Sequence, residues 1–436
     1  MFNNMIAVKD FKLVLFLFLA IFQPPFLPIN FIYILGLVTF FLLSKEDVKA
    51  YKNYILFESK IKNIYRFFIG IFVYFLFINV IDIIFIDARD LTATRLRCFN
   101  QLMVLSYFQF LFIFYLFLQF EKRNYGLADA FRLLILAGLL QGGCAVIAFF
   151  VPPIRTAFMF FGDRALYDND FFLERRGYGF SMTLIDTFGY GIGLIAGYMV
   201  LIGWPRRVKY RLLCIALLVF TTAINARTGL FVLVIAVFLK LIFGGGTFLK
   251  ALFSIGVLSL LLYILKVFFP VILEMGVRSD NATLVWICSD FLEMYYMAFE
   301  SGASNSMQME DATFLSNFVS LPDNYFEYIF GSGHYVYDTK HELGFRTDIG
   351  YYNLFWEFGI LMSGVILLKF ASFIGKPFLM TDNTKIKSIV VFNFVAYAFL
   401  LMKAILLGYN PGVFVNYYVT FVLYFYLKRD KRYSYV

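Results

Sequence analysis

Long uninterrupted runs of apolar residues, separated by short polar stretches, dominate the pattern along this chain. Runs such as Phe67–Phe85 and Leu102–Phe120 are long enough to cross the hydrocarbon core of a bilayer at a rise of about 1.5 Å per residue. Backbone groups in lipid must be paired within a helix or a closed barrel, and barrel strands alternate in polarity instead of running apolar throughout. The pattern therefore predicts an all-α, polytopic transmembrane helical bundle.

The apolar runs predict about twelve spans. Their approximate ranges are 11–27, 28–43, 65–85, 102–120, 128–150, 179–202, 211–224, 228–243, 247–270, 351–374, 387–407 and 411–427. One polar segment between the ninth and tenth spans is too long to be a loop without a purpose. We therefore predict three parts: spans 1–9 in residues 1–270, a large periplasmic loop in 271–350, and spans 10–12 with a short cytoplasmic tail in 351–436.

Composition and charge agree with a membrane protein. Hydrophobic residues make up 61% of the chain and charged residues 15%, with a mean hydropathy of +0.77, whereas soluble domains carry about a quarter charged residues. The net charge of +9 could indicate a nucleic-acid partner, but cytoplasmic loops of membrane proteins are also rich in Lys and Arg. If both termini are cytoplasmic, the inner segments hold about twice as many Lys and Arg as the outer ones. We predict a multi-pass protein of a bacterial inner membrane with both termini inside and no nucleic-acid partner.

Several cations break this rule by lying at or near the predicted outer face. They are Arg176, Arg227, Arg278, Arg346 and Lys403. For Lys403 the alternative is a side chain that reaches from its span to the interface. Arg227 lies between two short spans and is followed by Gly229, which lets another group approach the backbone closely. Because guanidinium groups bind phosphate oxygens bidentately, we predict an outward-facing site for a diphosphate or glycan.

Titratable groups before the tenth span could complete a catalytic site. His334 follows Gly331-Ser-Gly, and His341 precedes Asp348 at the mouth of that span. A histidine or carboxylate beside a sugar hydroxyl can act as a general base, although both histidines could instead be ordinary hydrated loop residues. Asp186, predicted two turns into the sixth span, is a candidate partner for one of the arginines. No histidine or cysteine pair has the spacing of metal ligands, so we expect neither a metal ion nor a cofactor.

Four segments carry a resemblance to a known family. They are Thr221–Leu230 with Ala-Arg-Thr-Gly, Tyr328–His334 with Gly-Ser-Gly, Arg346–Tyr352 with Thr-Asp-Ile-Gly followed by Glu357-Phe-Gly-Ile360, and, more weakly, Arg176–Ser181. In their order and predicted sidedness they resemble the O-antigen polymerase (Wzy) family, which is related more distantly to O-antigen ligases. The expected topology, with one large outer loop late in the chain, is similar along nearly the whole length.

This resemblance implies an integral-membrane, metal-independent, inverting glycosyltransferase of lipopolysaccharide biosynthesis. It would join undecaprenyl-diphosphate-linked repeat units, its donor and acceptor, at the periplasmic face. Membrane lipids and a chain-length regulator protein would be further partners. By position, Arg227 and Arg176 would hold the donor diphosphate, and His334, His341 or Asp348 would orient or deprotonate the acceptor hydroxyl.

Two alternatives stay open at this stage. Ligases tend to carry a His-Asn pair before the span with the Glu-x-Gly motif, whereas this chain has Arg346-Thr-Asp348 there, which favours a polymerase. A flippase or other transporter of lipid-linked oligosaccharides also suits twelve spans. Such proteins usually show two repeated halves and binding residues near the bilayer midplane, and the sequence shows neither.

Overall fold

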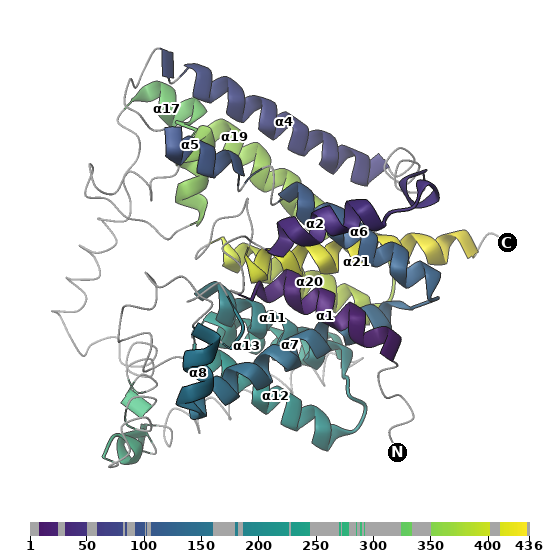
Figure 1. The fold of residues 1–436 in the computed structure, drawn as a ribbon, viewed down its shortest axis with the longest axis vertical. Helices are drawn as coiled ribbons and strands as arrows, with labels where there is room; N and C mark the ends of the chain where they lie inside the picture. Colours follow the sequence, from purple (N-terminus) through teal and green to yellow (C-terminus); the bar gives the residue numbers. More distant parts are fainter. Residues whose placement is uncertain are drawn as a thin grey trace.

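The protein is all-helical in the computed structural model, which has no strand among the residues that it describes. These residues are 8–24, 31–49, 59–81, 83–84, 92–100, 102, 106–159, 179–181, 186–225, 228–244, 270–271, 273–278, 285, 288–289, 292, 324–333, 350–401 and 410–433. Figure 1 shows the helices packed side by side, with the start of α1 and the end of α21 at the same end of the bundle. The prediction of an all-α fold is confirmed.

The helices follow the apolar runs of the sequence. They are α1 (Val8–Phe22), α2 (Phe31–Leu42), α4 (Ser59–Ile81), α5 (Thr92–Phe99), α6 (Ser106–Lys122), α7 (Leu127–Phe150), α8 (Pro152–Met159), α11 (Asp186–Ile202), α12 (Val208–Ala223), α13 (Thr228–Gly244), α17 (Tyr325–Phe330), α19 (Gly350–Gly375), the 3₁₀-helix η4 (Lys376–Met380), α20 (Thr384–Leu400) and α21 (Pro411–Tyr433). Each predicted span overlaps one of them except 247–270, which lies outside the described residues apart from its last residue.

Three of these helical stretches are long and apolar enough to cross a membrane: Lys62–Ile81, Leu127–Phe150 and Gly350–Met380, with 20, 24 and 31 residues. Four shorter helices are also strongly apolar, namely Phe31–Leu42, Phe188–Ile202, Thr228–Gly244 and Pro411–Leu427. Large apolar side chains stand on the outside of the bundle, such as Phe41 with 81% and Leu368 with 73% of its surface exposed. Such surfaces are unfavourable in water and suit contact with lipid.

The start of α11 differs from the prediction. Residues 179–181 are not helical, and the described part of α11 runs from Asp186. Gly179 has φ = 57° and lies against α7, where an added Cβ would be 2.8 Å from the backbone nitrogen of Ala145. Asp186 is therefore less than two turns inside its helix, because a helix that contains it cannot extend back as far as residue 181. The short helices α5 and α8 occupy segments that the sequence placed in outer loops.

Helix α21 runs through the centre of the bundle (Figure 1). Residues 411–427 are buried without exception, so this helix presents no face to lipid along that stretch. Two of its tyrosines bond to neighbouring helices: the hydroxyl of Tyr418 donates to the carbonyl of Ala130 in α7, and that of Tyr424 to the carbonyl of Phe373 in α19, both at 2.9 Å. These two buried hydroxyls thus find acceptors on other helices, as a dry environment favours.

A buried polar network joins α11, α20 and α21. The hydroxyl of Tyr198 donates to Oδ1 of Asn393 at 2.5 Å, and Nδ2 of Asn393 donates to Oγ1 of Thr420 at 2.8 Å. Thr420 in turn donates to the carbonyl of Asn416 at 2.8 Å. Interhelical hydrogen bonds of this kind stabilise helix association where lipid gives no hydrophobic driving force.

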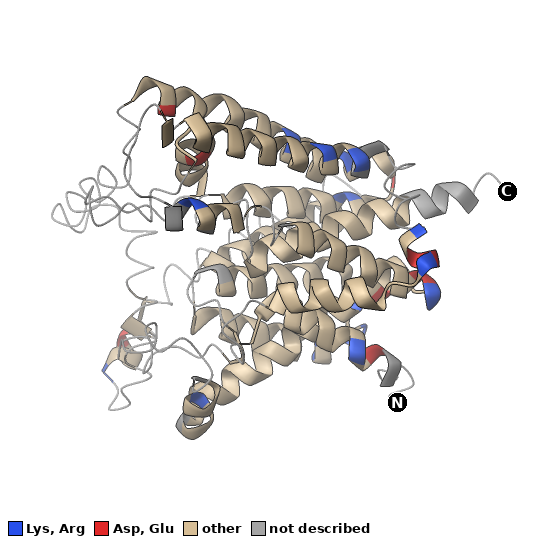
Figure 2. Cartoon of the chain, turned by 45° about the horizontal axis from the view of Figure 1, so that its top comes forward, with Lys and Arg blue, Asp and Glu red and all other residues tan. Residues whose placement is uncertain are grey.

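Among the described residues, Lys and Arg gather at the end of the bundle that holds the start of α1 and the end of α21 (Figure 2). Ion pairs at this end tie helices together. Asp10 of α1 accepts hydrogen bonds from the hydroxyl of Tyr125 and, at 3.0 Å, from Nη2 of Arg132 in α7. We call this the charged end of the bundle.

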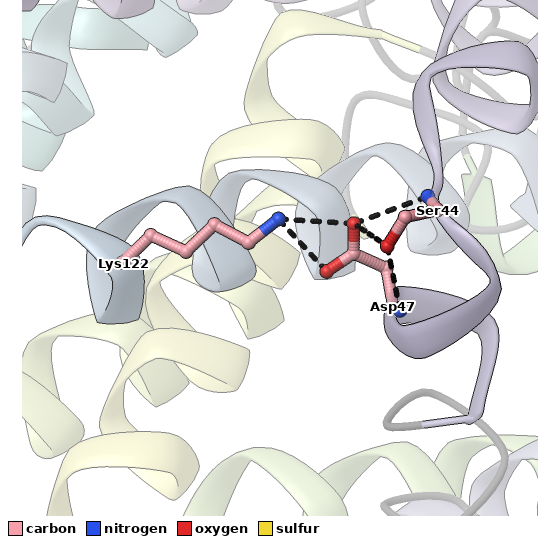
Figure 3. Close-up of polar contacts among 3 residues, drawn as sticks. All are labelled: Ser44, Asp47 and Lys122. Atoms are coloured by element: carbon pink, nitrogen blue, oxygen red, sulfur yellow. Dashed lines mark hydrogen bonds and ion pairs between the residues drawn. The ribbon is translucent and has the colours of Figure 1, made fainter.

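A second tie at the charged end fixes the turn after α2 (Figure 3). Asp47 accepts hydrogen bonds from the backbone N–H and the hydroxyl of Ser44, at 3.1 and 2.8 Å, and from Nζ of Lys122 at 2.9 Å. The backbone N–H of Asp47 donates back to the Ser44 hydroxyl at 3.1 Å, which completes a reciprocal capping arrangement. Burial raises the pKa of the Asp47 carboxyl, but the bonds from Lys122 and Ser44 outweigh it, so its pKa lies below the ordinary value.

Candidate functional site

Helix α19 contains a break at Gly359, which has φ = 66° and ψ = 173°. This backbone conformation is open almost only to glycine. A break leaves carbonyl groups of the preceding turn without their helical donors. In a segment apolar enough to span a membrane, those carbonyls need partners from elsewhere in the protein.

A remote segment supplies those partners. The backbone N–H groups of Ser332 and Gly333 donate to the carbonyls of Trp356 and Glu357, at 2.8 and 3.1 Å. The hydroxyl of Ser332 also donates to the Trp356 carbonyl at 2.9 Å. The segment Gly331–Gly333, which follows α17, is therefore seated on the break through main-chain bonds; we call this contact the loop seat.

Two further side chains complete the loop seat. The hydroxyl of Tyr74 in α4 lies 2.9 Å from the carbonyl of Phe330 and 3.4 Å from that of Phe358, so it bridges both sides of the contact. The hydroxyl of Ser363 reaches back across the break to the carbonyl of Leu354 at 2.8 Å. The seat thus joins α4, α17 and α19, as Figure 1 shows.

Glycine is required where the two backbones meet. A Cβ added to Gly359 would lie 2.2 Å from the carbonyl oxygen of Ile329, and one added to Gly331 would lie 2.5 Å from that of Glu357. Gly331 also has φ = 95°. Any larger residue at either position would separate the loop segment from the helix.

Glu357 adds a buried carboxyl side chain to the turn whose backbone holds the loop segment. The residue is only 1% exposed, and its Oε1 atom has no hydrogen-bond partner in the part of the chain that the structure describes. A buried carboxylate without a partner is strongly unfavourable. Ionisable residues in membrane-spanning segments usually pair or line a functional cavity, so Glu357 is a candidate functional group of the site.

A cation lies on the other side of the same loop segment. Gly333 is packed against Asn79 of α4, where an added Cβ would be 2.4 Å from Nδ2. Arg95 of α5 is 7% exposed and donates from Nη1 to Oδ1 and to the backbone carbonyl of Asn79, at 3.1 and 3.4 Å. The backbone leading into His334 is therefore flanked by the Asn79–Arg95 pair on one side and by the turn that carries Glu357 on the other.

Most of the site residues predicted from the sequence lie outside the described residues. These are Arg176, Arg227, His334, His341, Arg346, Asp348 and Lys403. Arg278 is described and exposed, and its backbone N–H donates to the carbonyl of Glu274 at 3.2 Å. Residues 273–277, next to Arg278, form the short blue-green helix at the lower left of Figure 1, whereas α17 lies at the upper left, so the structure does not bring Arg278 to the loop seat.

The structure explains the glycine of the Arg227-Thr-Gly229 junction. Gly229, the second residue of α13, lies against α11, where an added Cβ would be 2.0 Å from the carbonyl oxygen of Gly189. A Cβ on Gly193 would be 2.3 Å from the carbonyl oxygen of Gly229. The close approach predicted at Gly229 is thus made by the backbone of α11, and it fixes the start of α13 directly after Arg227.

Sequence reasoning missed the groups at the loop seat. Glu357 was singled out only as part of a motif, although an acidic residue within an apolar run was itself a signal. Arg95 lies in a segment predicted as an outer loop, and Asn79 within an apolar run, so neither stood out. Among the described residues no group of three His, Cys, Asp or Glu residues could hold a metal ion.

Comparisons with known proteins give no neighbour. No family model matches the chain. No curated protein matches it, and no solved structure does.

Proposed function

We propose that this chain is a polysaccharide polymerase that joins oligosaccharide repeat units carried on undecaprenyl diphosphate. One observation carries the proposal: two of the segments that resemble the O-antigen polymerase family, Tyr328–His334 and Glu357–Ile360, meet in the loop seat. They are separated in sequence and share main-chain hydrogen bonds and mutual glycine contacts. This arrangement supports the view that both belong to one site.

The reaction sets the roles that the site must fill. A base removes the proton of the acceptor hydroxyl, the oxygen attacks the anomeric carbon opposite the diphosphate, and the carbon–oxygen bond to the diphosphate breaks with its electrons leaving on the diphosphate. Among the candidate bases are Asp348, His334 and His341. Glu357 joins them because its carboxyl lies on the turn that holds the loop segment. Arg227, with Arg176, would stabilise the charge of the leaving diphosphate.

The proposed reaction belongs to the outer face of a bacterial inner membrane, with about twelve spans, both termini inside and residues 271–350 outside. The concentration of Lys and Arg at the charged end supports this orientation, since cytoplasmic ends carry the excess of basic residues (Figure 2). Reporter fusions at Lys340 and Arg432 are expected to report periplasm and cytoplasm, respectively. A cytoplasmic Lys340 would overturn the placement of the site.

The experiment that tests the function is complementation of a strain that lacks this gene. Arg227→Lys keeps the charge but loses the bidentate geometry of the guanidinium group, so it should reduce polymer formation, as should Arg227→Ala. A contact worth about 2–4 kcal/mol in the transition state corresponds to a loss of roughly 30- to 1000-fold in rate. Lipopolysaccharide should then show core plus one repeat unit and no ladder. Arg206→Ala is a matched control, because Arg206 is exposed at the charged end, and should keep the ladder.

The pattern of products separates the alternatives. Bare core with polymer accumulating on its lipid carrier would indicate a ligase, and bare core without external polymer a flippase. Either result in the Arg227→Ala strain, with normal protein levels, would refute the polymerase. An intact ladder would remove Arg227 from the mechanism.

A further inference from the structure

A cavity lies between α4 and the end of α19, far along these helices from the loop seat. Its volume is about 140 Å³, and it is lined chiefly by Asn63, Phe67, Lys369, Ser372, Lys376 and Tyr424. It lies toward the charged end of the bundle, where α4 begins (Figure 1). We call it the lysine cavity.

The two lysines reach the cavity from one face of α19 and η4. Lys369, Ser372 and Lys376 are spaced by three and four residues, which brings their side chains to the same side of a helix. Neither lysine has an ion-pair partner within the described part of the chain, and no acidic residue lines the cavity. Lys369 is exposed and Lys376 half-buried, so the two lysines line a small pocket that is open to the outside of the bundle and has no acidic residue in its wall.

The remaining walls are partly apolar. The rings of Phe373 and Tyr424 stack with centroids 5.1 Å apart and form one side, and the Tyr424 hydroxyl is already bonded to the Phe373 carbonyl. Toward the loop seat, Phe67 meets Phe370 at 6.4 Å and limits the cavity. Asn63 and Ser372 add polar groups beside the lysines. A ligand with an anionic head and apolar chains matches these walls.

We propose that the lysine cavity binds a phosphate anion, supplied in the membrane by the headgroup of an anionic phospholipid. Its volume equals that of roughly four to five water molecules at about 30 Å³ each, which is enough for a phosphate group. Basic pockets between membrane helices at a cytoplasmic face are suited to lipid headgroups. The bound phosphate neutralises Lys369, which lies within a segment long and apolar enough to span the membrane. This proposal does not depend on the proposed glycosyltransferase function.

Native mass spectrometry of the purified full-length protein tests the site with phosphatidylglycerol and phosphatidylcholine as probes. Phosphatidylglycerol should bind more tightly, and Lys369→Gln with Lys376→Gln should weaken its binding by tenfold or more, the loss expected for charge-assisted hydrogen bonds. Lys45→Gln with Lys49→Gln is the matched control, since it removes the same number of charges from lysines that do not line the cavity. Equal affinity of the cavity variant and the parent protein for phosphatidylglycerol would overturn the proposal.

A second variant and probe identify the source of the phosphate. Ser372→Glu places a carboxylate between the two lysines and should abolish preferential binding of phosphatidylglycerol while the protein stays folded. If millimolar inorganic phosphate displaces phosphatidylglycerol from the parent protein, the cavity recognises the phosphate group itself. Lysine-dependent binding of inorganic phosphate without any of phosphatidylglycerol would assign the site to a soluble phosphate and refute the lipid. Undiminished lipid preference in Ser372→Glu would refute the site.

Discussion

Replacing Gly359 by alanine should release the loop seat. The added Cβ would lie 2.2 Å from the carbonyl oxygen of Ile329, a distance that real contacts do not tolerate. The backbone at φ = 66° and ψ = 173° is also unfavourable for any residue with a side chain. Relief of the contact requires the segment that carries Ser332 and Gly333 to move away from α19.

The size of the effect follows from what is lost. The backbone conformation costs alanine about 1–3 kcal/mol, and the two main-chain hydrogen bonds to Trp356 and Glu357 are worth roughly 0.5–1.5 kcal/mol each. Together this destabilises the seated segment by about 2–6 kcal/mol, which corresponds to at least roughly a 30-fold increase in the open population. The change is local, because α19 continues on both sides of the break.

Amide hydrogen exchange measured by mass spectrometry is the direct assay. Peptides that contain Ser332 and Gly333 should exchange at least about 30-fold faster in Gly359→Ala, and polymer formation should fall with them. Gly364→Ala is the matched control in the same helix, since an added Cβ there meets nothing within 4 Å, and exchange should be unchanged. Parent-like exchange in Gly359→Ala would show that the loop does not depend on this contact.

Three further outcomes are expected. Glu357→Gln preserves shape and burial but cannot ionise, so polymer formation should fall by about tenfold or more at normal protein levels if the carboxylate takes part. Asp348→Ala should reduce polymer more than His341→Ala, because Asp348 lies closer to the mouth of the span. Asp47→Asn should lower the melting temperature at pH 7, and the difference should shrink as the pH falls below about 4 and vanish only once the pH is below the lowered pKa of Asp47 in the folded protein. The sign follows from the lowered pKa of Asp47, whose stabilising charge is present above the unfolded-state value and lost on protonation.

Each of these has its own control. Glu46→Gln changes an exposed carboxylate at the charged end and should leave the ladder intact; a normal ladder in Glu357→Gln would exclude that group. Equal output from Asp348→Ala and the parent would exclude Asp348. For Asp47, the control is Asp382→Asn, because the Asp382 carboxylate is exposed and lies 3.8 Å from Lys387. A difference in melting temperature between Asp47→Asn and the parent that does not change with pH would contradict the role assigned to the Asp47 charge.

The helices were predictable because the backbone of each long apolar run lies where no water can reach it. A helix pairs every backbone polar group of such a run except those at its ends. The ends of the helices were harder to predict. Gly179, predicted within a span, is not helical and packs against α7, and the start of α4 at Ser59 lies in a polar stretch that hydropathy does not mark as a span. Short helices such as α5 carry no apolar run of their own.

The loop seat was not predictable from either of its segments alone. Gly331–Gly333 and Glu357–Gly359 are each unremarkable runs, and only tertiary contact shows that one breaks a helix and the other repairs its hydrogen bonds. The same holds for Arg95, which becomes a site candidate through its bonds to Asn79. The residue types in the sequence indicated part of the chemistry of the candidate site, but they did not show which residues lie next to one another in the fold.

In the loop seat every hydrogen-bond acceptor is a backbone carbonyl, and the donors are two backbone N–H groups and the hydroxyls of Ser332, Tyr74 and Ser363, with glycines that leave room for the contact. Its geometry therefore places few demands on the side chains that follow it along the chain. Residues after Gly333 can change in size, charge or hydrogen-bonding pattern without shifting the anchor from which they project. An attachment of this kind separates the position of the segment after Gly333 from its chemistry, so substitutions there can change its side chains and leave the contact with α19 nearly untouched.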